Sequence, residues 1–418
     1  MQVFGVAEFA SRIGPAAGAW VMGASLYLGV RRWHGAHLAG ITLLVLATCP
    51  LYFVAAQYVN HDMLVAGLIT AAILAWVRGF EQPAAPGAGW LVLGWLACAG
   101  AVLAKGLIGM VLPLLVVGPW LLVQGGWLAP LRLLQPLGVL VFVIVAVPWF
   151  VAIQMRFPGF FDYFFIEQHF RRFAQSTFNN VKPFWFFLAM LPLLTLPWSV
   201  RLVSAARLVW RRRDPRAILY VWWVLVVVGF FSLPSSKLVG YGLPALAPWC
   251  ALLAMSLASV RPRVLGWIGG AAALLCLLIV AGLTWQGPKS NRGVALALAG
   301  QIAPGEPVVM VDDYFYDVPF YARLPQPVIV AGSWTDPAFT RRDSWRKELF
   351  EAGRFQPQRA RELLQPLSAA TGLACGSKRI WFIVEPAAAQ QVADLPGAAR
   401  VFADAASELW FVAAAPCR

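Results

Sequence analysis

The sequence predicts an α-helical bundle of about ten transmembrane spans, followed by a small soluble α/β domain at the C-terminus. Of the 418 residues, 60% are hydrophobic and only 12% are charged, whereas soluble domains are about half apolar and a quarter charged. A helix needs about 20 apolar residues to cross the bilayer core, and such stretches recur from Ile13 to Trp285. The 20 Trp and nine Tyr suit the headgroup level of a membrane, where such rings act as anchors.

The apolar stretches divide the first part of the chain into ten expected spans. They lie at 13–30, 36–57, 63–78, 88–104, 107–123, 137–155, 184–200, 217–233, 241–258 and 264–285. After Gly287, short β-rich runs occur at 308–311, 328–330, 380–384 and 409–412, and polar-faced helices are expected at 338–352 and 356–370. We therefore expect a membrane domain over residues 1–285 and an α/β domain over residues 286–418.

The charge distribution predicts the orientation of the bundle and argues against nucleic acid as a partner. Residues 1–285 carry 19 Lys and Arg against 6 Asp and Glu, and residues 286–418 carry 14 against 13. The basic excess lies in short connections between spans, above all at 201–216, which the positive-inside rule assigns to the cytoplasm. The opposite connections and the C-terminal domain then face outward, which in a bacterium means the periplasmic side of the inner membrane. The net charge of +14 is thus a topology signal.

The six cysteines follow the same division. Four lie inside apolar stretches and are interpreted as small hydrophobic residues. Cys375 and Cys417 lie in the C-terminal domain, where an oxidising periplasm would allow a disulfide between them, and two free thiols are the alternative.

Ionisable groups are few on the outward side, and in a membrane protein each of them is a functional candidate. The candidates are Asp62, Lys105, His169, Arg171, Arg172, Lys237 and Tyr241. Lys and Arg suit an anionic phosphate, while a carboxylate and a histidine suit a general base or a divalent metal. The connection at 156–183 alternates Phe with basic residues, so we expect it in the membrane plane against lipid headgroups. This set matches chemistry on a lipid phosphate.

Each candidate also has a purely structural interpretation. Asp62 suits the N-cap of the helix that follows it, and Lys105 suits the turn between two hairpin helices. His169 lies among several phenylalanines and suits a plain interfacial position. Lys237 and Tyr241 suit anchoring at the interface. None of these residues decides the function alone.

Four blocks of sequence are more specific in their order than any one of them is alone. They are Asn60-His61-Asp62-Met63, Ala104-Lys105-Gly106-Leu107-Ile108-Gly109, Glu167-Gln168-His169-Phe170-Arg171-Arg172-Phe173 and Ser235-Ser236-Lys237-Leu238-Val239-Gly240-Tyr241-Gly242-Leu243-Pro244. In order and spacing they resemble the ArnT family of aminoarabinose lipid A transferases, which is related to the protein mannosyltransferases. The resemblance covers about residues 3–285, and the C-terminal domain matches only in position and type.

The resemblance implies a large-cavity glycosyltransferase (GT-C) fold with an active site that opens to the periplasm. Such proteins move a sugar from undecaprenyl phosphate, a polyprenyl phosphate, to an acceptor, typically lipid A. By the same resemblance, Asp62 matches an acidic position at a span end and His169 a histidine near a bound metal. Lys105 matches a cavity lysine, and Tyr241 a residue near the lipid phosphate. The expected catalytic residues, which would also hold a divalent metal if one is required, are Asp62 and His169. The expected substrate-binding residues are Lys105, Arg171, Arg172, Lys237 and Tyr241.

One departure from the family concerns the start of the chain. The family begins with a further span and a periplasmic loop that bears the aspartate regarded as catalytic, whereas residues 4–12 resemble the segment just after that loop. Either the start codon has been assigned too late, or the chain is a truncated and inactive homologue. An outward-facing start with no span before it favours missing sequence.

Two other functions compete with sugar transfer. One is a transporter or flippase of lipid-linked sugars, but transporters often have repeated halves with broken helices, and the sequence shows no such repeat. The other is an inactive remnant that binds only lipid or a partner. In-frame DNA upstream of Met1 that encodes a span and an acidic loop would favour the enzyme, and a stop codon the remnant.

Overall fold

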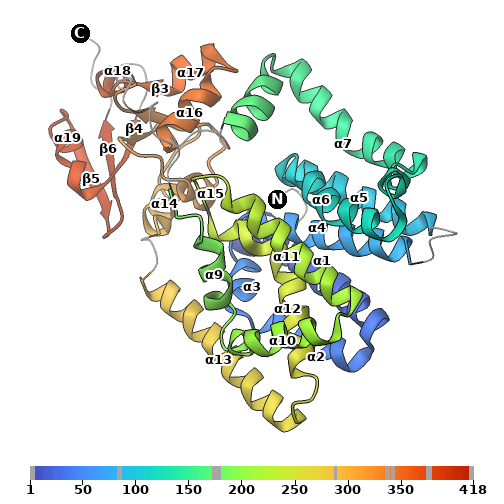
Figure 1. Ribbon diagram of the computed structural model, residues 1–418. Helices are drawn as coiled ribbons and strands as arrows, with labels where there is room; N and C mark the ends of the chain where they lie inside the picture. Colours follow the sequence, from blue (N-terminus) through green and yellow to red (C-terminus); the bar gives the residue numbers. More distant parts are fainter. Residues whose placement is uncertain are drawn as a thin grey trace. The chain divides into compact units, whose positions relative to one another are not determined.

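The chain forms two compact units, a helical unit over Glu8–Trp285 and a second unit made mainly of Gln286–Arg418. The structure, a computed structural model, describes residues 5–81, 87–171, 180–286, 290–334, 339, 344–372 and 379–413, without the side chains of 168–171, 286, 370 and 371. Figure 1 shows the helices of the first unit and the sheet of the second.

In the part of the chain that the structure describes, eight helical segments are long and apolar enough to cross a membrane. They are α1 (Glu8–His34), α4 (Asp62–Gly79), α5 (Ala88–Lys105), α6 (Ile108–Gly125), α7 (Pro136–Arg156), α11 (Pro215–Ser232), α12 (Leu243–Leu257) with the short turn before it, and α13 (Pro262–Gln286). Their buried cysteines are free thiols. The prediction of a multi-pass helical membrane protein is confirmed.

Two of the ten expected spans are not continuous helices. The segment expected at 36–57 divides into α2 (Ala36–Ala47) and α3 (Pro50–Ala55), because Pro50 has no N–H for a helical hydrogen bond and instead begins a new helix. The segment expected at 184–200 contains α9 (Phe186–Leu194), after which the chain bends by 110° before it continues into α10 (Leu202–Arg212). Among the described residues the candidate spans therefore number eight, or nine if the bent pair crosses as one.

Helix α4 is the most buried of the eight segments and lies in the middle of its unit, packed against α1, α5, α6 and α12. Where α1 crosses α4, Gly18 and Gly67 meet, and a Cβ atom on either residue would overlap the backbone of the other helix. Small residues at such crossings allow close backbone contact, which favours helix association in lipid. This packing fixes the position of Asp62, the first residue of α4.

A π-helical segment, Asp162–Arg171, follows α7. Phenylalanine rings contact one another here, namely those of Phe150, Phe160, Phe161, Phe164 and Phe165. That this segment lies in the membrane plane stays a prediction.

The second unit contains a mixed sheet with the strand order β3-β2-β1-β4-β6-β5. The strands are β1 (Val308–Val311), β2 (Ile329–Ala331), β3 (Leu364–Gln365), β4 (Arg379–Val384), β5 (Ala398–Ala403) and β6 (Glu408–Ala413). The first four run parallel, and β6 is antiparallel to both β4 and β5. After β1 the chain adds β2 and β3 on one side and then returns to add β4 on the other. The strand order therefore reverses between β1 and β4.

Helices cover both faces of this sheet. On one face, α14 (Arg292–Ala299) and α15 (Asp317–Tyr321) form a core with Met310 and Trp381. On the other face, α19 (Gln390–Ala393) contributes to a separate core. A doubly covered, mostly parallel sheet is typical of α/β folds.

The four strands expected in this unit are present, but the expected helices are partly wrong. The helix expected at 356–370 is α17 (Pro357–Leu363), then β3, then α18 (Leu367–Gly372), since Pro366 cannot donate a helical hydrogen bond. Helix α16 (Trp345–Gly353) begins after Ser344, whose hydroxyl accepts from the Lys347 N–H at 3.3 Å.

Candidate functional site

An ion pair joins the first residue of α4 to the last residue of α5. Lys105 Nζ donates to Asp62 Oδ1, and only 19% and 8% of these side chains are exposed. Only residues 80–87 separate the end of α4 from the start of α5 in the sequence, and the start of α4 meets the end of α5. An acidic residue in the first turn and a basic residue in the last turn also complement the helix dipoles. Removing one partner would leave the other charge buried, at a cost of about 3–5 kcal/mol.

The turn that precedes α12 covers this ion pair. The Lys105 ammonium lies 4.6 Å from the centroid of the Tyr241 ring, which is a cation–π distance. The Tyr241 ring in turn stacks on Phe231 of α11, with the centroids 5.0 Å apart. A Cβ atom on Gly240 would collide with the Asp62 carboxylate, so a larger residue at this position would have to displace that carboxylate. Residues from α4, α5, α11 and the turn therefore meet at one end of the bundle.

His61 belongs to the same site, although the sequence offered only its position beside Asp62 as a signal. Burial, and second the nearby Lys105 ammonium, lower the pKa of His61 from its ordinary value of 6.5. The imidazole is therefore neutral at pH 7. Asn60 Oδ1 accepts from the backbone N–H of Asp62 at 2.8 Å. The capping interpretation of Asp62 is thus wrong, because its carboxylate pairs with Lys105 instead of capping α4.

Lys237 is 3% exposed and its ammonium group bonds to backbone oxygens. Its Nζ donates to the carbonyl of Lys182 at 3.1 Å and to the carbonyl of Pro234. The backbones of 180–182 and 235–237 also pair as a short antiparallel bridge. Burial lowers the pKa of the Lys237 ammonium. These contacts favour a role in fastening two loops together over the substrate contact that the sequence suggested.

The structure thus brings together Asp62, Lys105 and Tyr241 and places Lys237 on the segment that leads to Tyr241. Arg172 lies outside the described residues, as do Cys375 and Cys417. His169 and Arg171 belong to the π-helical segment, but their side chains also lie outside the description. The roles of these residues in binding and catalysis stay predictions.

That Asp62 and His169 hold a divalent metal stays a prediction, because the His169 side chain lies outside the described residues. Among the residues that the structure describes, no group of three or more His, Cys, Asp or Glu is placed to hold a metal ion. The Asp62 carboxylate faces an ammonium group, whose charge repels a metal cation.

Arginine side chains gather at the opposite end of the bundle. Arg78, near the end of α4, and Arg32 both pair with Glu81. Asp62 and Arg78 belong to one helix, and a rise of 1.5 Å per residue separates them by about 24 Å. The Asp62–Lys105 pair and the arginine-rich connections therefore lie at opposite ends.

Comparison with known proteins agrees with this architecture. The dolichyl-phosphate-mannose-protein mannosyltransferase family matches residues 1–164. The undecaprenyl phosphate-alpha-4-amino-4-deoxy-L-arabinose arabinosyl transferase of Enterobacter sp. (strain 638) is 32% identical over 262 residues, which cover 61% of this chain and 47% of the relative. The transferase of the same name from Aeromonas hydrophila is 30% identical over 320 residues, which cover 73% and 58%. The chain spans about half the length of the curated relatives that it matches.

Solved structures extend the similarity to the fold of nearly the whole chain. The crystal structure of ArnT from Cupriavidus metallidurans bound to undecaprenyl phosphate aligns with a TM-score of 0.81 at 24% identity, covering 98% of this chain and 85% of that one. The apo form aligns with a TM-score of 0.79. The chain thus has the fold of these ArnT structures, and its sequence is similar to that of the arabinosyl transferases over the covered part.

Proposed function

We propose that the chain transfers a sugar from a polyprenyl-phosphate donor to an acceptor such as lipid A. The observation that carries the proposal is a partly buried ammonium group, Lys105, held between Asp62 and the Tyr241 ring at one end of the bundle. A fixed positive charge at a bundle end suits the phosphate of an amphiphilic lipid. The names of the curated relatives, which specify undecaprenyl phosphate as the carrier of an aminoarabinose, support this donor class.

The same proposal includes the orientation of the site. The positive-inside rule assigns the arginine-rich end, with Arg32 and Arg78, to the cytoplasm. The Asp62–Lys105 pair then faces the periplasm of a bacterial inner membrane, where lipid A is available. We extend the proposal to the C-terminal unit, which follows α13. From Asp62 the chain would cross with α4, α5, α6, α7, the bent pair α9 and α10, α11, α12 and α13, an even number of crossings that returns it to the periplasmic side.

The chemistry assigned to Lys105 is stabilisation of the leaving group. An acceptor oxygen attacks the anomeric carbon, the bond between that carbon and the phosphate oxygen breaks, and its electron pair stays on the lipid phosphate. The phosphate gains negative charge in this step, and an ammonium group already fixed by Asp62 stabilises that charge without reorganising. We assign Tyr241 to the same phosphate, keep Arg171 and Arg172 as proposed substrate contacts, and keep His169 with Asp62 as proposed catalytic residues.

A sugar-transfer assay in proteoliposomes, with an undecaprenyl-phosphate-linked donor, tests the assignment. In the expressed protein, Asp62 and His169 are replaced together by Ala. We expect transfer to fall by about 10²-fold or more. The control variant is Arg263→Gln, at an exposed position where α13 begins, which should retain full activity. Normal transfer by the double variant would remove Asp62 and His169 from the site.

A further inference from the structure

Helix α10 lies across the arginine-rich end of the bundle. Just before it, Arg201 Nη2 donates to the carbonyl of Ser256, in the last turn of α12, at 3.0 Å. Just after it, Asp214 Oδ2 lies 3.7 Å from Nδ1 of His34, the last residue of α1. Both anchors belong to the arginine-rich end, because α12 starts at the opposite end and α1 ends two residues after Arg32. With 11 residues and a length of about 16 Å, α10 therefore connects two points of this end instead of running along the bundle.

Two apolar stripes run along α10. Leu202, Ala205 and Val209 face the bundle, where Ala205 is buried and the other two pack against the core. Val203 and Trp210 lie on a neighbouring stripe and are 59% and 78% exposed. They are seven residues apart, which is two helical turns, so their side chains lie on one face of the helix. The described chain leaves this second stripe largely open.

The exposed surface beside the open stripe is basic. It consists of exposed arginines on α10 and directly after it, namely Arg207, Arg211, Arg212 and Arg213. The segment 202–213 contains no acidic residue, and the ion pairs found in the described part of the chain include none of these arginines. The Arg213 guanidinium lies 6.0 Å from the centroid of the Trp210 ring, so the basic surface adjoins the apolar stripe.

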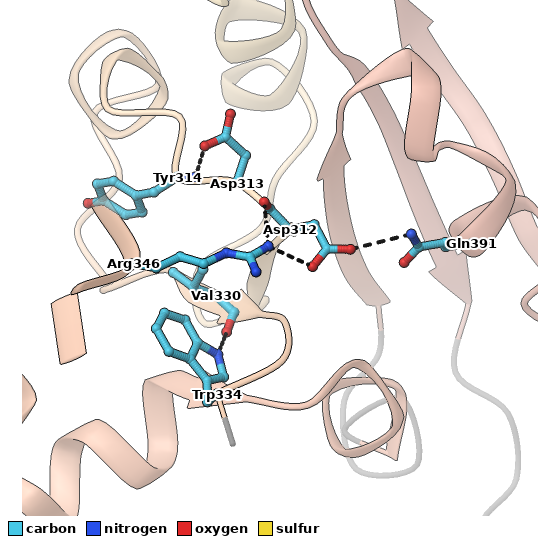
Figure 2. A network of polar contacts seen from close by, with 7 residues as sticks. All are labelled: Asp312, Asp313, Tyr314, Val330, Trp334, Arg346 and Gln391. Carbon is cyan, nitrogen blue, oxygen red and sulfur yellow. Dashed lines mark hydrogen bonds and ion pairs between the residues drawn. The ribbon is translucent and has the colours of Figure 1, made fainter. Parts of the chain in front are cut away.

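These arginines differ from the partly buried Arg346 of the C-terminal unit. Arg346 Nη2 donates to the carboxylate of Asp312 and to its backbone carbonyl, both at 3.0 Å. Figure 2 shows the guanidinium group directed at Asp312, whose carboxylate also accepts from Gln391. Arg346 thus has its counter-ion within the protein. The anionic group that the charges of α10 can pair with belongs to another molecule.

We propose that α10 is a binding surface for an anionic phospholipid, such as phosphatidylglycerol, at the arginine-rich end of the bundle. Val203 and Trp210 enter the boundary between headgroups and acyl chains, while Arg207 and Arg211 donate to the lipid phosphate. The open apolar stripe favours a lipid over a soluble anion or a nucleic acid, because these would contact the arginines alone. Helix α11 begins at Pro215, directly after this segment, so α10 lies at the level where a span enters the membrane.

This inference does not depend on sugar transfer. The arginine-rich end is the end of the bundle opposite to the Asp62–Lys105 pair, and the experiment measures lipid binding without a sugar donor. A chain that transfers no sugar would still bind the lipid, so the two proposals fail separately.

Native mass spectrometry of the full chain in a neutral detergent tests the proposal, with phosphatidylglycerol and phosphatidylcholine of the same acyl chains as the two ligands. We expect the tightest-bound phosphatidylglycerol to bind at least about tenfold more tightly than phosphatidylcholine. An arginine near anionic lipid contributes about fivefold in affinity, so Arg207→Gln/Arg211→Gln should weaken phosphatidylglycerol binding by about 20-fold. Phosphatidylcholine binding should change little, since this lipid carries no net charge.

The matched control is Arg261→Gln/Arg263→Gln, which removes the same charge from exposed positions at the same end of the bundle, where α13 begins. This variant should bind both lipids as the wild type does. Trp210→Ala should weaken the binding of both lipids by the same factor, because apolar contact does not depend on the headgroup charge. All five positions are exposed, so the variants should fold.

Three results would each overturn the proposal. They are equal binding of the two lipids by the wild type, unchanged phosphatidylglycerol binding in Arg207→Gln/Arg211→Gln, and an equal loss of binding in the two double variants. The last result would assign the selectivity to the net charge of this end of the bundle and not to α10. Displacement of phosphatidylglycerol by an equal concentration of inorganic phosphate would also overturn it, since it would assign the arginines to soluble anions.

Discussion

Gly240 lies directly against the Asp62 carboxylate, with Oδ2 facing the glycine while Oδ1 pairs with Lys105. The turn before α12 and the pair between α4 and α5 are distant in the sequence, but each fixes the position of the other. A side chain at residue 240 would have to displace the carboxylate, and with it the ammonium group that the carboxylate holds.

The first prediction concerns Gly240→Ala. Because the added methyl group overlaps the Asp62 carboxylate, we expect a loss of about 1–3 kcal/mol in the free energy of unfolding. We also expect sugar transfer to fall at least about tenfold, since the Lys105 ammonium moves with its partner. Thermal unfolding and the proteoliposome assay measure the two effects.

Gly229→Ala in α11 is the matched control for this variant. Beyond its chain neighbours and the backbone of α11, a methyl group at Gly229 would have no atom within 4 Å, and alanine is a better helix former than glycine. Stability should stay the same or rise, and transfer should be unchanged. If Gly240→Ala and Gly229→Ala had the same stability and the same transfer rate, the contact between Gly240 and Asp62 would not contribute to either.

The second prediction separates the structural from the chemical role of Lys105. Lys105→Met leaves the Asp62 carboxylate buried without its partner, so the protein should lose both stability and transfer, the latter by about 10²-fold. In the double variant Lys105→Met/Asp62→Asn the buried charge is removed as well, and stability should largely return. Transfer should stay low, because the charge that stabilises the leaving phosphate is still missing. Recovery of transfer in the double variant would show that Lys105 serves only to neutralise Asp62.

The sequence predicted the part of the site that depends on span ends. Asp62 begins one hydrophobic span and Lys105 ends the next, so their proximity follows from alternating helix direction. Tyr241 was placed on that side by the same reasoning. The contacts of Gly240 and the burial of Lys237 could not be predicted, because both depend on how a turn packs against helices far away in the sequence.

For the fold, too, the sequence predicted the elements but not their breaks and bends. Long apolar stretches identify spanning helices, but they do not show where a proline divides a stretch, as Pro50 does, or how sharply the chain bends after α9. In the C-terminal unit, strands with Val, Ile and aromatic residues were visible. Strand β5 was missed because it is rich in alanine and half of its residues are exposed, and β3 because it has only two residues.

The third prediction tests the fastening role of Lys237. Lys237→Met removes the bonds to the carbonyls of Lys182 and Pro234, and we expect faster amide hydrogen exchange in peptides that cover 180–186. Lys182→Met is the control, because the Lys182 side chain is exposed and only its backbone oxygen takes part. Unchanged exchange in Lys237→Met would mean that the backbone bridge alone holds the two loops.

The fourth prediction concerns pH. The pKa of His61 is lowered by burial, so the unfolded chain takes up a proton at this residue before the folded protein does. The stabilisation that neutral His61 provides is complete above pH 6.5, the ordinary pKa of histidine. It is lost as the pH falls through the lowered pKa that His61 has in the folded protein. The melting temperature should therefore decrease between about pH 6.5 and pH 5, and it should decrease less in His61→Gln. If the melting temperatures of wild type and His61→Gln fell equally at acidic pH, His61 would be excluded as the group responsible.

The fifth prediction concerns Glu306, which is 6% exposed in the C-terminal unit. Burial alone would raise its pKa, but bonds from Trp381 Nε1 at 2.7 Å, the Ala303 N–H at 2.9 Å and Arg379 Nε at 2.8 Å lower it. The stabilisation by this carboxylate is therefore present above pH 4.5, the ordinary pKa of glutamate. It is lost as the pH falls through the lowered pKa that Glu306 has in the folded protein.

Glu306→Gln keeps the shape of the carboxylate but removes its charge, and we expect it to destabilise this unit by about 1–3 kcal/mol at pH 7. Hydrogen exchange of peptides that cover β4 measures the effect, with Glu362→Gln at an exposed position as the control. The difference between wild type and Glu306→Gln should shrink at acidic pH, because protonation removes the same charge from the wild-type side chain. A difference that stays constant down to pH values at which Glu306 is protonated would assign the loss to packing, since packing does not titrate.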